Sequence, residues 1–129
     1  MKPPSRQDTI NLRVWRAQTG VQVIEGITGL NLYPLAVHRP ISEFEEIQEG
    51  NRSRYSGTWC ITHIPTGKSF GINSKEWEKI VYYVEGIKDE PALLMLTDKT
   101  MTDHPCFKQL SDRHTELRNN LSNPSRWAT

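Results

Sequence analysis

The sequence predicts an α+β fold, with an antiparallel sheet made of N-terminal strands and a central hairpin, packed on one face by two or three C-terminal helices. Strand-like runs of β-branched and aromatic residues occupy the chain as far as residue 72, and apolar residues with helical spacing follow. Strands first and helices last are typical of α+β domains. We expect a single domain over residues 10–121, with flexible tails at 1–9 and 122–129.

Strand character begins at residue 11, and Thr19-Gly20 predicts a turn before a second strand. A later apolar run, 30–37, contains Pro34, which predicts an edge position or a bulge because proline cannot donate to a sheet ladder. Residues 41–54 leave two interpretations open. Ile41, Phe44 and Ile47 have the spacing of a short amphipathic helix. The other interpretation is a solvated acidic loop, in which Glu43, Glu45, Glu46 and Glu49 face water.

The clearest local pattern is a β-hairpin over residues 55–72, with its turn at Pro65-Thr66-Gly67. Gly67-Lys68-Ser69 also matches the end of a phosphate-binding P-loop. The first glycine of that motif is replaced by Thr62, and the residues after Ser69 are extended rather than helical. We therefore expect a hairpin turn at this point, and no cofactor.

Three helices are expected after the hairpin. Asn73 and Glu76 resemble a capping box, which predicts a helix that begins there and ends near Gly86. A short helix is expected over 92–96. Over 105–121 a narrow apolar stripe predicts a third helix, which covers either its own sheet or a partner.

Charge and composition exclude several classes of protein. Sixteen basic and 15 acidic residues give a net charge of +1, too small for strong attraction to nucleic acid or an anionic membrane. Two cysteines are fewer than a secreted disulfide scaffold uses. The N-terminus lacks the apolar core of a signal peptide, and no run approaches the ~18 apolar residues of a membrane span. We expect a cytoplasmic protein with no membrane partner.

No catalytic or metal motif is recognisable. The four histidines have no zinc-pair spacing, and Cys60 and His63 point to opposite faces if they lie on one strand. No glycine-rich oxyanion turn lies beside Cys60. We expect no metal and no enzymatic activity. A small enzyme that pairs Cys60 with His38 or His63 is one alternative.

A candidate binding surface combines arginines, aromatic residues and a lysine in or beside the expected strands. These residues are Arg13, Trp15, Arg16, Arg52, Arg54, Tyr55, Trp59 and Lys68. Such residues suit an interface hot spot or stacking on single-stranded nucleic acid, although a core covered by the helices is the favoured interpretation of the two tryptophans. We expect a small non-catalytic binding, adaptor or inhibitory module acting through protein–protein contacts. A nucleic-acid-binding domain that uses this sheet face is the other alternative.

Overall fold

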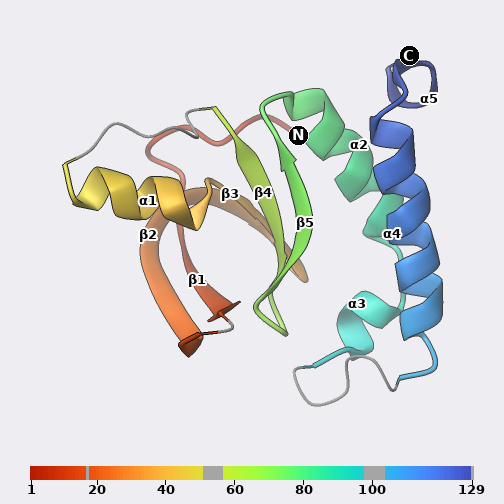
Figure 1. Cartoon of the computed structure of the whole chain (residues 1–129), viewed down its shortest axis with the longest axis horizontal. Coiled ribbons are helices and arrows are strands. Elements are labelled where there is room, and N and C mark those ends of the chain that lie inside the picture. Colours follow the sequence, from red (N-terminus) through yellow and green to blue (C-terminus); the bar gives the residue numbers. More distant parts are fainter. Residues whose placement is uncertain (17, 51–56, 98–103, 129) are drawn as a thin grey trace.

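The computed structural model describes residues 1–16, 18–50, 57–97 and 104–128. Its elements are β1 (Thr9–Arg16), β2 (Gly20–Leu32), β3 (Leu35–His38), α1 (Ile41–Gln48), β4 (Trp59–His63), β5 (Lys68–Ser74), α2 (Trp77–Ile87), α3 (Ala92–Met95), α4 (Phe107–Leu121) and α5 (Pro124–Trp127). The strands form one antiparallel sheet in the order β1-β2-β3-β4-β5. The C-terminal helices lie on one side of this sheet and α1 on the other (Figure 1). The predicted fold class is confirmed.

The central strand β3 is buried on both faces and separates two apolar cores. Leu35 and Val37 point toward the larger core, which the sheet forms with α2, α3 and α4. Ala36 points the other way, into a smaller core against α1. The other buried members of that smaller core are Leu12, Val14, Ile24 and Ile27. Alternation along a strand therefore decides which core each β3 side chain joins.

Two bulges curl the sheet. The register of β1 and β2 shifts between Ile10 and Leu12, where Gly26 takes a φ of 73° and donates its N–H to the Asn11 side chain at 3.1 Å. A second shift in β4 and β5 contains Gly71, with a φ of 71°. Bulges increase strand twist, so the two edge strands bend toward each other on the α1 side.

The curl closes at one contact. The Trp15 amide on β1 donates to the Gly67 carbonyl in the β4–β5 turn at 2.8 Å. Gly67 has a φ of 70°, as expected for the glycine of the predicted hairpin turn. A Cβ at this position would lie only 3.0 Å from both the Arg13 carbonyl oxygen and the Trp15 nitrogen. Glycine is therefore required for the close approach as well as for the turn.

Pro34 lies in the turn between β2 and β3, so the prediction of an edge position or a bulge within one strand is wrong. The Tyr33–Pro34 peptide bond is cis, and the Pro34 carbonyl accepts a hydrogen bond from the Ile64 amide at 2.8 Å. Of the two interpretations of residues 41–54, the structure has the helix over Ile41–Gln48, α1, and residues 51–54 lie outside the described residues. The expected solvated acidic face is wrong for Glu43, which is buried.

The helix boundaries differ from the expected ones. Asn73 belongs to β5, and α2 begins at Trp77 after the Ser74 hydroxyl has accepted the Glu76 amide at 3.0 Å. Gly86 does not end α2, which continues to Ile87. A Cβ on Gly86 would lie 2.5 Å from Leu117 of α4, so this glycine allows the two helices to pack closely.

The predicted helix over 105–121 is α4, and its apolar stripe faces α2 rather than a partner. Leu110 and Leu117 are its buried residues and belong to the larger core. The N-terminus lies beside the start of α2 (Figure 1). The Met1 carbonyl accepts the indole N–H of Trp77 at 3.1 Å. In the part of the chain that the structure describes, no helix has the length and apolarity needed to cross a membrane.

Candidate functional site

The two-stranded ribbon of β1 and β2 exposes apolar side chains on its outer face. Trp15 lies opposite Val21 in the register, and Arg13 lies opposite Val23. Trp15, Val21 and Val23 are 45%, 48% and 58% exposed. We call the surface formed by Arg13, Trp15, Val21, Val23 and Lys68 the ribbon face. Its position follows from alternation, because Leu12 and Val14 take the inner positions of β1.

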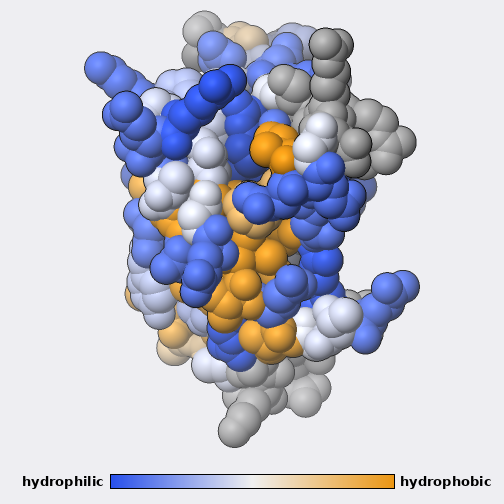
Figure 2. All heavy atoms as spheres, turned by 90° about the vertical axis from the view of Figure 1, so that its left-hand side faces the viewer, coloured by the Kyte–Doolittle hydropathy of each residue, from blue (hydrophilic) through white to orange (hydrophobic). Residues whose placement is uncertain are grey.

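Lys68 completes the ribbon face from the far edge of the sheet. Its ammonium nitrogen lies 5.0 Å from the centroid of the Trp15 ring, within the range of a cation–π contact. The contact exists because the β4–β5 turn closes on β1. Figure 2, viewed from the side where α1 and β2 lie, shows hydrophobic residues gathered in one band between hydrophilic ones. The exposed large apolar residues of these two elements are Val21, Val23 and Ile47.

The structure brings together three of the eight residues of the predicted binding surface: Arg13, Trp15 and Lys68. Arg16 lies on the opposite face of β1, where its guanidinium forms an ion pair with Glu45 of α1. Trp59 is buried, so the single surface expected from the sequence does not include it. Arg52, Arg54 and Tyr55 lie outside the described residues.

Trp59 is fixed in the core by aromatic and cationic neighbours. Its ring makes an edge contact with Trp77, with 5.3 Å between the ring centroids. The Arg39 guanidinium lies 3.8 Å from the Trp59 ring centroid and donates to the Thr58 carbonyl at 3.1 Å. These contacts give Trp59 a packing role.

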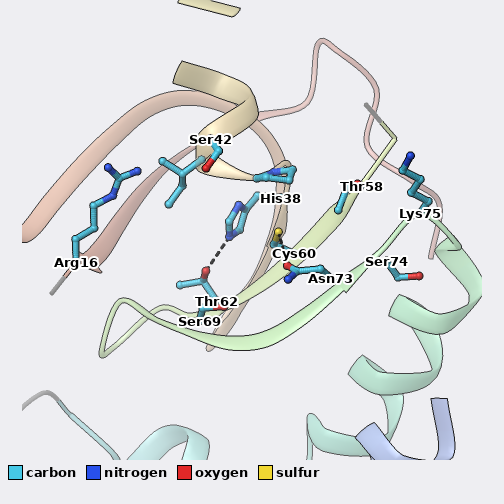
Figure 3. Close-up of a pocket in the computed structure, with 12 residues that line it drawn as sticks. Arg16, His38, Ser42, Thr58, Cys60, Thr62, Ser69, Asn73, Ser74 and Lys75 are labelled. Atoms are coloured by element: carbon cyan, nitrogen blue, oxygen red, sulfur yellow. Dashed lines mark hydrogen bonds between the residues drawn. The ribbon is translucent and has the colours of Figure 1, made fainter. Parts of the chain in front are cut away.

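The inner face of the curled sheet encloses an open cavity of about 620 Å³ beneath the start of α1 (Figure 3). We call it the inner cavity. The residues that line it are mostly of polar types and come from β1, β3, β4, β5, α1 and the positions next to these elements. The lining residues are Arg16, His38, Pro40, Ile41, Ser42, Thr58, Cys60, Thr62, Ser69, Asn73, Ser74 and Lys75.

His38 and Cys60 are direct cross-strand neighbours on the floor of this cavity. The His38 ring contacts the Arg39 carbonyl through Nδ1 at 2.6 Å and the Thr62 hydroxyl through Nε2 at 2.7 Å. The Cys60 thiol donates to the Asn73 side-chain oxygen at 2.9 Å. In the enzyme alternative His38 would pair with Cys60. The hydrogen bonds of His38 instead go to Arg39 and Thr62, and that of Cys60 goes to Asn73.

Burial sets the protonation of both groups. It lowers the pKa of His38 and so favours the neutral ring. It also raises the pKa of the Cys60 thiol to about 11, and the negative charge of Glu43 adds to that rise. A thiol with such a pKa is protonated at neutral pH, whereas a nucleophilic cysteine needs a lowered pKa.

Glu43 is the buried charge that the sequence pattern did not reveal. Its Oε2 atom has no hydrogen-bond partner among the described residues. Burial raises the pKa of its carboxyl group, and the positive charge of Arg39 opposes that rise. The helical spacing of Ile41, Phe44 and Ile47 did not predict the burial of Glu43, because Glu43 is not one of these apolar positions.

His63 lies on the other face of the sheet from Cys60, as their spacing predicted. Its Nε2–H donates to the Leu93 carbonyl at 2.7 Å, and its Nδ1 accepts the Thr66 hydroxyl at 2.8 Å. His63 therefore ties the β4–β5 turn to α3. Within the described ranges, no three histidine, cysteine, aspartate or glutamate side chains gather in a way that could hold a metal ion.

The inner cavity had a signal in the sequence. Along β4 and β5 the inner positions Cys60, Thr62, Ser69 and Asn73 are small and polar, whereas their outer neighbours are large and mostly apolar.

No protein-family model, curated protein or solved structure matches this chain.

Proposed function

We propose that the protein is a non-catalytic binding module that docks a partner protein on the ribbon face. The observation that carries this proposal is the exposure of Trp15 directly beside Val21 and Val23. Exposed tryptophan is costly in water and is enriched at the energetic centres of protein interfaces. The two valines extend its apolar surface along the ribbon.

The chemistry of the partner follows from the charges around Trp15. The Lys68 ammonium lies over the indole ring, so a partner that covers the ring also meets this cation. We therefore expect an apolar partner surface with carboxylates at its rim. The other exposed apolar pair, Leu94 and Met95 of α3, is aliphatic and has no aromatic anchor.

Binding of nucleic acid is less well supported by the same residues. Single-stranded nucleic acid is bound by several aromatic side chains along a basic groove. Arg16 lies on the opposite face of β1, and Trp59 is buried. Trp15 is then the one predicted aromatic residue exposed in the described part of the chain, and two valines rather than aromatics flank it.

The experiment compares two variants that each remove one exposed aromatic side chain. Trp15→Ala removes the centre of the ribbon face, and Tyr33→Ala removes a ring that is 63% exposed in the β2–β3 turn. Wild type and both variants are used as bait in native lysate, with and without nuclease. Captured proteins are quantified by mass spectrometry, and circular dichroism checks that both variants fold.

The proposal requires proteins that wild type and Tyr33→Ala retain after nuclease and that Trp15→Ala loses. A photo-crosslinking residue at position 23 should then attach to the same proteins, and one at position 33 should not. If capture is abolished by nuclease and binding weakens steeply as the salt concentration rises, binding of nucleic acid becomes the favoured function. Equal capture by all three baits would refute a role for the ribbon face.

A further inference from the structure

The inner cavity is separate from the ribbon face, and its lining differs in chemistry from the inner positions beside it. Along β1, β2 and β3 the neighbouring inner positions are filled by the apolar residues of the smaller core. The cavity is instead lined by five hydroxyl side chains, those of Ser42, Thr58, Thr62, Ser69 and Ser74. Thr58 and Thr62 are buried, and apolar side chains at these two positions would stabilise the fold more, because burial of polar groups gains little.

The hydrogen bonds on the floor leave both donor and acceptor atoms facing the cavity. Because the Arg39 carbonyl can only accept, His38 carries its proton on Nδ1, and Nε2 accepts the Thr62 hydroxyl proton. The Thr62 oxygen keeps lone pairs for another donor. Asn73 accepts the Cys60 thiol with its oxygen and keeps its amide N–H groups. Ligand hydroxyl groups match such a floor, since they both donate and accept.

The charges at the cavity are positive. Arg16 and Lys75 lie at its opposite ends (Figure 3), and no carboxylate is among the described residues that line it. Helix α1 brings two carboxylates near. Glu45 is ion-paired with Arg16, and Glu43 lines a different cavity, although its negative charge contributes to the raised pKa of Cys60. Lys75 is exposed and makes no ion pair within the described ranges.

We infer that the inner cavity binds a small hydroxylated anion with the chemistry and size of a sugar phosphate. The volume of about 620 Å³ lies within the ~300–1,000 Å³ typical of small-molecule sites. Lys75, which has no ion pair among the described residues, attracts the phosphate, and Thr62 and Asn73 bind the hydroxyl groups. The ligand covers the polar floor beside His38 and Cys60.

The test titrates the full chain with ribose 5-phosphate and with glucose 6-phosphate, followed by calorimetry and by amide chemical shifts. The expected shifts cluster at Thr62, Asn73 and their neighbours in the cavity. Ribose and inorganic phosphate, each carrying half of the chemistry, should bind at least about tenfold more weakly.

Charge variants locate the site. Lys75→Gln should weaken binding by about tenfold, because it removes the charge-assisted contact to the phosphate. Arg16→Gln leaves the Glu45 carboxylate unpaired near the cavity and should also weaken binding of an anion. Glu45→Gln frees Arg16 from its ion pair and should strengthen binding. The matched control is Lys108→Gln, which removes the same charge from an exposed ion pair on α4 and should leave affinity unchanged.

The reactivity of the Cys60 thiol reports on ligand binding without any substitution of a residue that lines the cavity. In a Cys106→Ser protein the sugar phosphate should slow alkylation of Cys60 severalfold, because the thiol lines the same cavity. The inference is wrong if neither sugar phosphate shifts the cavity amides at millimolar concentration. It is equally wrong if Lys108→Gln weakens binding as much as Lys75→Gln, or if alkylation of Cys60 is unaffected.

Discussion

Replacement of Gly67 by alanine would strain the one contact that closes the curled sheet. Gly67 has a φ of 70°, and its carbonyl accepts the Trp15 amide at 2.8 Å. The added Cβ would lie 3.0 Å from the Arg13 oxygen and from the Trp15 nitrogen, and 3.2 Å from the Val14 carbonyl carbon. All three are backbone atoms of β1, so the turn or the strand must move.

The cost has two parts. Alanine in a left-handed conformation costs about 1–2 kcal/mol relative to glycine. Displacement of the turn also weakens the Trp15–Gly67 hydrogen bond, which adds about 0.5–1.5 kcal/mol, or more if a buried group loses its partner. We expect Gly67→Ala to lower the free energy of unfolding by about 1.5–3.5 kcal/mol.

Gly71→Ala is the matched control, because Gly71 has nearly the same φ, 71°, and nothing within 4 Å of its Cβ position. Gly71→Ala should lower the free energy of unfolding only by the cost of alanine in a left-handed conformation, about 1–2 kcal/mol. Urea unfolding followed by tryptophan fluorescence measures both variants. Equal losses of stability in the two variants would refute the reasoning that close packing of the turn on β1 holds the sheet closed.

Three further predictions concern stability and reactivity. Gly86→Ala should destabilise the fold by about 1–3 kcal/mol, since its Cβ would lie 2.5 Å from Leu117. Adding Leu117→Ala should cost less than the sum of the single losses in urea unfolding, and strict additivity would contradict the proposed clash. Burial lowers the pKa of both His38 and His63, so the unfolded state binds more protons below its own pKa of about 6.5. Stability should be full above that pH and fall as the pH drops, by up to about 1.4 kcal/mol per pH unit for each ring. Urea midpoints of wild type and His63→Gln between pH 7.5 and pH 5 measure this, and a pH dependence unchanged in the variant would count against it. Because the pKa of Cys60 is raised to about 11, alkylation of Cys60 in a Cys106→Ser protein should be slow at pH 8 and speed up toward pH 11. Folded and urea-unfolded protein reacting equally fast at pH 8 would show that burial does not control the thiol.

Local patterns predicted the elements well where nearby residues decide the structure. The hairpin turn at Gly67 and the stripe of α4 both depend on residues close in the chain, and both are confirmed. The capping pair at Asn73 failed because β5 continues to Ser74, beyond the bulge at Gly71. A strand that pairs with a neighbour overrides a weak local helix signal, which the sequence pattern alone does not reveal.

The candidate site was harder to predict because it depends on long-range geometry. Trp15 and Trp59 both lie in alternating strands, and alternation does not say which face the helices cover. Strand parity separates Arg13 from Arg16, yet the prediction placed both on one surface, which is wrong for Arg16. The curl that makes the inner face a cavity depends on the bulges at Gly26 and Gly71. The pairing of His38 with Cys60 required the register of β3 on β4.

The strand order β1-β2-β3-β4-β5 also has a consequence during synthesis. Each strand pairs with the one made just before it, so a chain emerging from the ribosome can extend its sheet without waiting for distant segments. The helices that cover Leu35, Val37 and Ile61 are made last. Until they arrive, one apolar face of a nascent sheet is open to water, and a chaperone that binds such surfaces would be needed most in this interval.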